Sequence, residues 1–243
     1  TKIPESKSDL DKFANFIAKN KDKSAALIIE PLIQCAGGMK FHQAEILAEI
    51  VKICKKNDIL TIFDECAVGF YRTGEKFAFH HTNITPDILL IGKALTGGFL
   101  TLAATMTSEK IYKAFLANSL DKALMHGPTF MGNALACSAA NASLDLFERY
   151  DYATKTANIA DIFAAELTGL ETSENIKEIR IKGAVAVIEF KQISWSEILI
   201  MREKLITEKI WLRPFANVLY FMPPLTIKPK ELKKLIQAAK KVL

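Results

Sequence analysis

The spacing of apolar and polar residues predicts alternating strands and helices over most of the chain. Short, continuous apolar runs predict buried strands, whereas apolar residues repeating every 3.6 positions predict amphipathic helices. The expected strands are residues 25–30, 59–64, 87–91 and 100–106, and the expected helices are residues 9–21, 44–56, 108–117, 133–149 and 151–170. Strands that are apolar throughout are typical of parallel sheets covered on both faces, so we expect an α/β architecture.

The pattern changes after residue 150. Residues 176–181 and 184–190 are expected to pair as strands around a Lys-Gly turn, followed by a helix at 195–209, short strands at 211–213 and 218–222, and a last helix after Pro229. This order predicts a smaller α+β unit. We therefore expect residues 1–150 to be part of a large α/β domain and residues 151–243 to form a small C-terminal domain.

Composition narrows the class of protein. The chain has 243 residues, of which 50% are hydrophobic and 24% are charged, so it can bury a core and is not expected to be disordered. No uninterrupted apolar run reaches the roughly 18 residues that span a bilayer, and the N-terminus shows no apolar signal segment. The four cysteines form no C-x-x-C motif, which is typical of reduced thiols in a cytoplasmic protein.

The net charge of +5 is spread thinly along the chain. Nucleic-acid-binding surfaces usually concentrate basic residues on one element, so we expect no nucleic-acid partner. Because no apolar run is long enough to span a bilayer, we expect no membrane partner either. The sequence also lacks a P-loop, a G-x-G-x-x-G fingerprint and an H-E-x-x-H motif, and its four histidines never stand four apart. A metal site is therefore not expected.

Lys93 and Asp64 are the first candidates for chemistry. Asp64 ends one predicted buried strand and Lys93 follows the next one, 29 residues later, at the edge where open α/β sheets bind ligands. A lysine amine with little water around it is readily neutral and can attack a carbonyl group; the alternative is a lysine that reaches solvent or pairs with a carboxylate. For Asp64 the alternative is a structural salt bridge. A lysine that bonds the cofactor and an aspartate that pairs a pyridinium nitrogen are the minimal set for pyridoxal phosphate.

Two arginines are candidates for binding a carboxylate. Arg72 and Arg213 lie in irregular segments between apolar residues, where a planar guanidinium suits a carboxylate. The alternative for each is an arginine that fastens a loop. In addition, the Gly127-Pro128-Thr129 loop before a predicted helix offers backbone N–H groups and a hydroxyl to a phosphate, although ordinary helix caps look the same.

Several segments together resemble the class III pyridoxal-phosphate-dependent aminotransferases. The segments are DECAVGFYRTG at 64–74, GKALTGG at 92–98, EPLIQCAGGM at 30–39, HGPTFMGN at 126–133, WLRPF at 211–215 and YFMPP at 220–224. Within the family they are most similar to the biotin-pathway enzymes that use S-adenosylmethionine to aminate 8-amino-7-oxononanoate, giving 7,8-diaminononanoate. The resemblance implies the α/β fold type I of pyridoxal-phosphate-dependent transferases, of which this chain would be the C-terminal portion.

The resemblance also implies a role for each candidate. Lys93 would bond the cofactor covalently and Asp64 would pair its pyridine nitrogen. Pro128 and Thr129 would reach the phosphate of the neighbouring subunit's cofactor, which implies a homodimer with shared active sites.

On the substrate side, Gly127 would border the substrate, Arg213 would bind the carboxylate of 8-amino-7-oxononanoate, and Arg72 would line the substrate pocket. Tyr71 departs from the family, which usually has glycine before this arginine.

Other functions stay open at this point. The chain resembles, less closely, other class III ω-aminotransferases of the acetylornithine or β-alanine type. A non-catalytic scaffold that lacks the N-terminal half of the family is an alternative of a different class. A Schiff-base lyase on a TIM barrel fits poorly, because only about four strands with helical crossovers are expected and a barrel needs eight.

Overall fold

A computed structural model describes residues 2–243, which form two compact units. The first unit contains the chain up to Leu32, His42–Phe70 and Phe77–Tyr150. The second contains Asp151–Leu243 together with two short segments from earlier in the chain, Ile33–Phe41 and Tyr71–Lys76. The second unit therefore also contains two segments from before residue 151, which the sequence pattern did not assign to the expected C-terminal domain.

The elements follow one another as mixed helices and strands. The α-helices are α1 (Lys7–Asn20), α2 (Ala44–Lys56), α3 (Glu109–Ala114), α4 (Ala134–Arg149), α5 (Tyr152–Leu167), α6 (Trp195–Thr207) and α7 (Pro229–Lys240). The strands are β1 (Ala26–Ile29), β2 (Ile33–Gln34), β3 (Lys40–Phe41), β4 (Leu60–Asp64), β5 (Ile88–Ile91), β6 (Ala104–Thr107), β7 (Ile176–Lys182), β8 (Val185–Phe190) and β9 (Val218–Phe221). Across residues 2–243, no helix combines the length and apolar character that crossing a bilayer requires.

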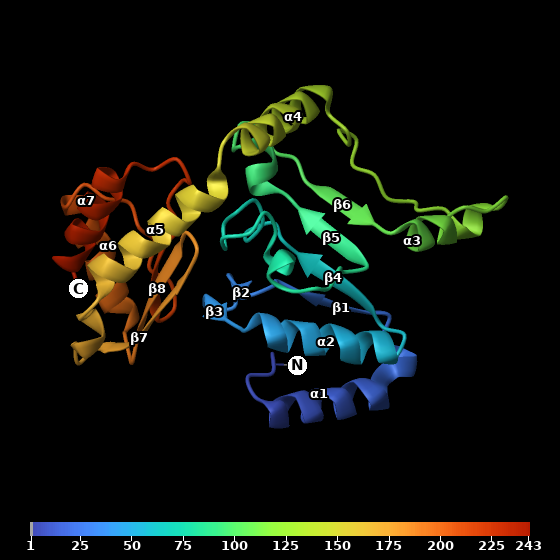
Figure 1. The fold of residues 1–243 in the computed structure, drawn as a ribbon, viewed down its shortest axis with the longest axis horizontal. Helices are drawn as coiled ribbons and strands as arrows, with labels where there is room; N and C mark the ends of the chain where they lie inside the picture. Colours follow the sequence, from blue (N-terminus) through green and yellow to red (C-terminus); the bar gives the residue numbers. More distant parts are fainter. Residues whose placement is uncertain (1) are drawn as a thin grey trace. The chain divides into compact units, whose positions relative to one another are not determined.

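The first unit is built on a four-stranded sheet with the order β1-β4-β5-β6. The first three strands are parallel, as their apolar runs predicted, and β6 is antiparallel to β5. Figure 1 shows the arrowheads of β4 and β5 pointing the same way, so their carboxyl ends lie at one edge of the sheet. This edge is where side chains from successive strands can meet.

Helix α2 occupies the predicted residues 44–56 and shows why the sequence forms a helix there. Its buried residues recur at helical spacing, and α2 packs against β4 while α1 packs against α2. The buried residues of α2 are Leu47, Ile50, Val51 and Cys54. At the start of α1, the Ser6 hydroxyl accepts a hydrogen bond from the Asp9 N–H, which caps the helix.

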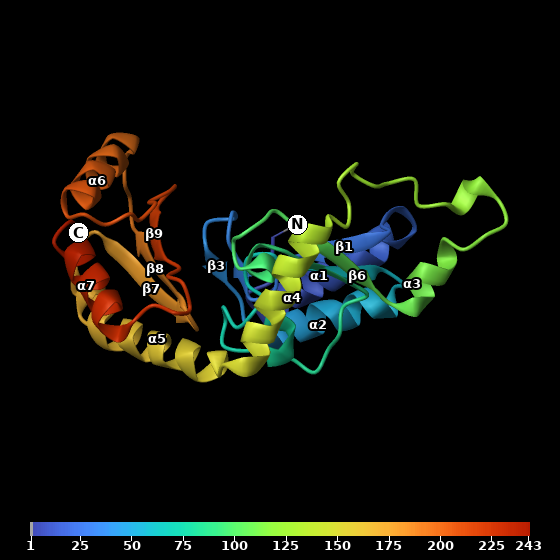
Figure 2. The same cartoon turned by 90° about the horizontal axis from the view of Figure 1, so that it is seen from above.

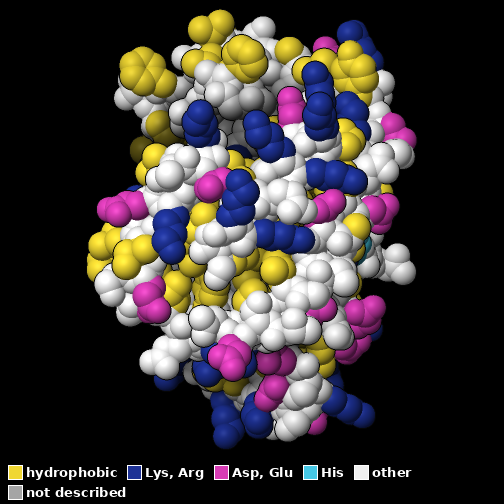
Figure 3. All heavy atoms as spheres, turned by 90° about the vertical axis from the view of Figure 1, so that its left-hand side faces the viewer, with side chains coloured by type: hydrophobic (Ala, Val, Ile, Leu, Met, Phe, Trp, Pro, Cys, Tyr) yellow, Lys and Arg dark blue, Asp and Glu magenta, His cyan; other side chains and the backbone are white. Residues whose placement is uncertain are grey.

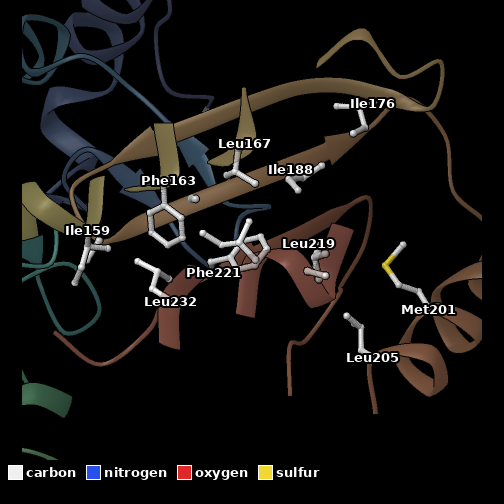
Figure 4. Packing of buried hydrophobic residues seen from close by; sticks show 14 of the residues in the cluster. Ile159, Phe163, Leu167, Ile176, Ile188, Met201, Leu205, Leu219, Phe221 and Leu232 are labelled. Carbon is white, nitrogen blue, oxygen red and sulfur yellow. The ribbon is translucent and has the colours of Figure 1, made fainter. Parts of the chain in front are cut away.

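The second unit has its own core between an antiparallel sheet and helices. Its sheet has the order β7-β8-β9, and every residue of β8 is buried. In Figure 4, Phe163 of α5, Phe221 of β9 and Leu232 of α7 point into one apolar cluster. The rings of Phe163 and Phe221 lie 5.8 Å apart. The second unit therefore contains an antiparallel sheet and helices that share one apolar core.

Two expectations about strands are wrong. The segment at 211–213 forms no strand, because it runs into Pro214, which has no N–H to donate to a sheet. The sheet of the first unit is also not covered on both faces by this chain: Ile28 on the edge strand β1 is 61% exposed, and most of β6 is exposed. Parts of the apolar strands β1 and β6 therefore stay exposed, because no other described residues of this chain cover them.

Charged residues are mixed on the surface of the second unit. Figure 3 shows Lys and Arg side chains on one face, interspersed with Asp, Glu and apolar side chains. Two ion pairs of the second unit join Lys233 to Glu166 and Lys241 to Glu208.

Candidate active site

The candidate lysine and aspartate lie at the same edge of the first unit's sheet. Asp64 is the last residue of β4 and pairs in register with Leu90 of β5. Lys93 follows three residues after Leu90, just beyond the end of β5. The Glu65 N–H also donates to the Leu90 carbonyl at 2.9 Å, which continues the pairing past Asp64. Parallel pairing of the two strands thus brings a carboxylate and an amine to one edge.

Cys66 connects the two candidates. Its N–H donates to Asp64 Oδ1 at 3.0 Å and orients the carboxylate. Burial raises the pKa of the Cys66 thiol to about 11; the Asp64 carboxylate raises it further, and the Lys93 ammonium acts in the opposite direction. Glu30, directly after β1, adds to the upward shift of the same pKa. The charges of Asp64, Lys93 and Glu30, which stand at or just beyond the ends of β4, β5 and β1, therefore all act on this one thiol.

Lys93 itself is exposed and has an unusual backbone. It begins the 3₁₀ turn η3 (Lys93–Thr96) with a φ of 47°, in the left-handed region that residues with a Cβ rarely adopt. The sequence predicted that little water surrounds the Lys93 amine. Among the described residues this prediction is wrong, because Lys93 is exposed to solvent. Strained backbone of this kind is common at functional sites.

Glu65 is a buried acid beside the site that the sequence reasoning missed. Its two carboxylate oxygens accept hydrogen bonds from the N–H groups of Ala78 and Phe79, at 2.7 and 2.9 Å. Burial raises the pKa of Glu65 to about 7, although these two hydrogen bonds act to lower it. Glu65 thus links the start of the loop after β4 to residues 78 and 79 by hydrogen bonds. The signal in the sequence was a second acid directly after Asp64.

Arg72 belongs to the second unit, where its guanidinium fastens a loop. Its Nη1 donates to the carbonyls of Pro223 at 2.6 Å and Ala184 at 3.3 Å. Burial lowers the pKa of Arg72 to about 10. These contacts support the loop-fastening alternative, while the substrate-binding role stays a prediction. Tyr71 before it has a φ of 66°, which explains physically why glycine suits this position.

Arg213 is exposed in the irregular segment before β9. Its neighbour Pro214 is buried, which anchors the segment, whereas Trp211 is 73% exposed. The guanidinium is accessible to a ligand carboxylate, and that role stays a prediction.

The residues 127–129 lie on an exposed segment of the first unit. The Pro128 carbonyl accepts a hydrogen bond from the Met131 N–H, which closes a turn around Thr129. Helix α4 begins only at Ala134, where the Asn133 side chain accepts from the Ala136 N–H. The predicted phosphate loop is therefore a separate turn before the helix cap, with Gly127, Pro128 and Thr129 all exposed. Figures 1 and 2 show the segment between α3 and α4 running away from the sheet of its own unit.

The residues at the sheet edge fit pyridoxal phosphate. The cofactor needs an amine for its aldehyde and a carboxylate for its pyridinium nitrogen, and the neighbouring strand ends present one group of each kind, in Lys93 and Asp64. Within the part of the chain that the structure describes, no three His, Cys, Asp or Glu side chains gather as a metal site would require.

Comparisons with known proteins point in the same direction. The family model described as aminotransferase class-III matches residues 3–243. The adenosylmethionine-8-amino-7-oxononanoate aminotransferase of Buchnera aphidicola subsp. Schizaphis graminum is 40% identical over 235 residues, which cover 97% of this chain and 54% of that protein. The chain thus spans about half the length of the curated relatives it matches.

Solved structures show the same fold. The crystal structure of adenosylmethionine-8-amino-7-oxononanoate aminotransferase from Methanocaldococcus jannaschii aligns with a TM-score of 0.89 and 34% identity, covering 96% of this chain and 56% of the other. The acetylornithine aminotransferase of Elizabethkingia anophelis aligns with a TM-score of 0.85 and 28% identity, covering 97% and 58%. The expected fold class is confirmed by these neighbours, which are both named as aminotransferases.

Proposed function

We propose, from the premise that this chain belongs to the class III aminotransferase family, that its protein transfers an amino group from S-adenosylmethionine to 8-amino-7-oxononanoate in biotin biosynthesis. The structural support is the placement of Asp64 and Lys93 at neighbouring carboxyl ends of β4 and β5. The support for the substrates is the 40% identity to a relative named for them. Both the reaction and the substrates are proposed for the whole protein, of which this chain covers one part.

Lys93 and Asp64 hold the cofactor in this proposal. Pyridoxal phosphate, when bound, supplies an electron sink that weakens the bonds at the substrate's Cα. Lys93 Nζ forms the covalent attachment and, once released, moves the proton at Cα. The Asp64 carboxylate, oriented by the Cys66 N–H, keeps the pyridine nitrogen protonated. Transfer in two half-reactions, donor first and ketone second, predicts ping-pong kinetics.

The remaining candidates bind phosphate and substrate. Thr129, with the Pro128 backbone, offers an accessible hydroxyl to the cofactor phosphate of a second subunit, and Gly127 borders the substrate. Arg213 presents an exposed guanidinium to the substrate carboxylate. Arg72 contributes to the substrate pocket. Its guanidinium holds the loop in place by donating to the carbonyls of Ala184 and Pro223.

A homodimer is part of the same proposal. The segment between α3 and α4 and its flanks expose many large apolar side chains, more than a monomer surface normally leaves in one stretch. They include Leu116, Leu120, Leu124, Met125, Phe130 and Met131. A second copy that covers this segment would both bury these side chains and receive Thr129. Sedimentation of the protein tests this, with a dimer mass as the expected result and a monomer as the contrary one.

We place the protein in the cytoplasm. Cys54, Cys66 and Cys137 carry free thiols, which suits a reducing compartment. Fractionation of the source cells tests this placement.

The proposed reaction is tested by supplying the protein with pyridoxal phosphate, 8-amino-7-oxononanoate and one amino donor at a time. S-Adenosylmethionine should yield 7,8-diaminononanoate, detected by mass, and Lys93→Ala should yield none. Lysine is run in parallel as the alternative donor. Turnover with acetylornithine or β-alanine instead would assign the protein to another branch of the family. Cofactor binding without turnover of any donor would refute the proposed reaction, and a folded protein that binds no cofactor would favour the scaffold alternative.

A further inference from the structure

The backbone of Lys93 is held in a left-handed conformation that its side chain disfavours. The φ of Lys93 is 47°, and the turn ends with Gly97 and Gly98 at φ values of 61° and 86°. The two glycines adopt this region without a Cβ penalty, whereas a lysine does not. A strained residue keeps such a conformation only when its surroundings fix it.

Backbone hydrogen bonds form the frame of the turn. The Leu95 N–H donates to the Gly92 carbonyl and the Gly97 N–H donates to the Ala94 carbonyl, both at 3.0 Å. These bonds define the turn η3, but they form within the turn itself and do not anchor it to the rest of the unit.

Two buried hydroxyls supply further contacts. Ser143 Oγ donates to the Ala94 carbonyl at 3.0 Å, and Thr96 Oγ1 donates to the Leu100 carbonyl at 2.6 Å. Ser143 is 8% exposed and Thr96 is 2% exposed. A buried hydroxyl needs a hydrogen-bond partner, and water does not compete for the hydrogen bond that it forms.

Ser143 links the turn to a long helix. It lies on α4, whose buried face consists of the small residues Ala136, Ala140 and Ser143, and this face packs against η3. Small side chains let the helix approach the turn closely enough for a serine hydroxyl to reach the Ala94 carbonyl. The carbonyl next to Lys93 is therefore anchored to a 16-residue helix rather than to a flexible loop.

We propose that Ser143 and Thr96 are positioning residues that hold the left-handed turn of Lys93, so that its amine meets the cofactor aldehyde beside Asp64. The proposal rests on the proposed function, because it assigns Lys93 to the cofactor. Loss of either hydroxyl lets the turn relax toward right-handed backbone, and the amine then samples more orientations.

The test compares Ser143→Ala and Thr96→Val with Ser138→Ala, an exposed serine on the same helix. Without cofactor, hydrogen exchange at the Leu95 and Gly97 amides is expected to be about three- to tenfold faster in the two test variants, as loss of one hydrogen bond implies. With pyridoxal phosphate, borohydride trapping at Lys93 is expected to slow by about the same factor, and the pH midpoint of the cofactor's absorbance band to shift. Ser138→Ala should match the unaltered protein in all three measurements.

A merely structural role would lower the unfolding midpoint but leave the trapping rate and the pH midpoint unchanged, and that result overturns the proposal. Ser143→Ala removes only one oxygen atom, so it remains a usable variant if Thr96→Val fails to fold. If the unaltered protein takes up no cofactor at Lys93, the proposed function fails and the positioning role falls with it. If the unaltered protein is trapped at Lys93 and the variants react equally fast, only the positioning role fails.

Discussion

The contact between Gly183 and the Arg72 loop offers a sharp test of how the second unit is built. Gly183, between β7 and β8, has a φ of 55°, and a Cβ there would lie 2.5 Å from the Thr73 carbonyl carbon and 2.6 Å from the Arg72 oxygen. Both distances are far below van der Waals contact, and both atoms are backbone. The loop cannot simply swing away, because the Arg72 carbonyl accepts from the Ala184 N–H at 3.0 Å.

The expected cost of Gly183→Ala follows from these distances. A left-handed φ costs an alanine about 1 kcal/mol, and forcing a methyl group into packed backbone adds about 1–3 kcal/mol. Gly169→Ala is the matched control in the same unit, since Gly169 has a φ of 87° and nothing within 4 Å of the added Cβ. That control should lose only the conformational term, about 1 kcal/mol.

Urea unfolding of both variants, followed by circular dichroism, measures the difference. Gly183→Ala should lower the free energy of unfolding by about 2–4 kcal/mol, clearly more than Gly169→Ala. Equal losses in the two variants would refute the close packing of the Arg72 loop on the β7–β8 turn.

Three further predictions concern buried groups. Burial raises the pKa of Glu65 to about 7, so the folded state binds this proton more tightly than the unfolded state does. The free energy of unfolding should therefore fall as pH rises from about 4.5 to about 7. Glu65→Gln should remove this pH dependence in urea titrations at several pH values. For Glu189, burial alone would raise the pKa, but hydrogen bonds from Lys177 and Arg180 bring it down to about 2. Its stabilising contribution should therefore be present above pH 4.5 and fade as pH falls toward 2, and Glu189→Gln should flatten the acid limb of the same titration. Phe163→Ala, at a fully buried site, should cost about 3–5 kcal/mol in urea unfolding, and a loss below about 1 kcal/mol would contradict the packing of the second core.

The sequence predicted the features that depend on local periodicity. The helix at 44–56 and the parallel strands ending at Asp64 and near Lys93 all follow from apolar spacing, since burial of one face is what that spacing records. The edge of the sheet at which Asp64 and Lys93 lie could therefore be inferred from the sequence alone.

Features that depend on contacts between distant segments could not be predicted. The carbonyls that hold the Arg72 guanidinium lie 112 and 151 residues away in sequence. The β2–β3 pairing involves strands of two residues each, too short to show a period. The left-handed backbone of Lys93 likewise lies in a turn whose Ala94 carbonyl is bonded by Ser143, which stands 50 residues after Lys93.

The central claim is that Lys93 is the residue that bonds pyridoxal phosphate. The most direct measurement is peptide mass spectrometry of the folded protein after incubation with pyridoxal phosphate and reduction with borohydride. We predict one pyridoxyl group on the peptide containing Lys93, and none there in Asp64→Ala at limiting cofactor. A folded protein without this adduct, or with adducts spread evenly over surface lysines, would contradict the claim.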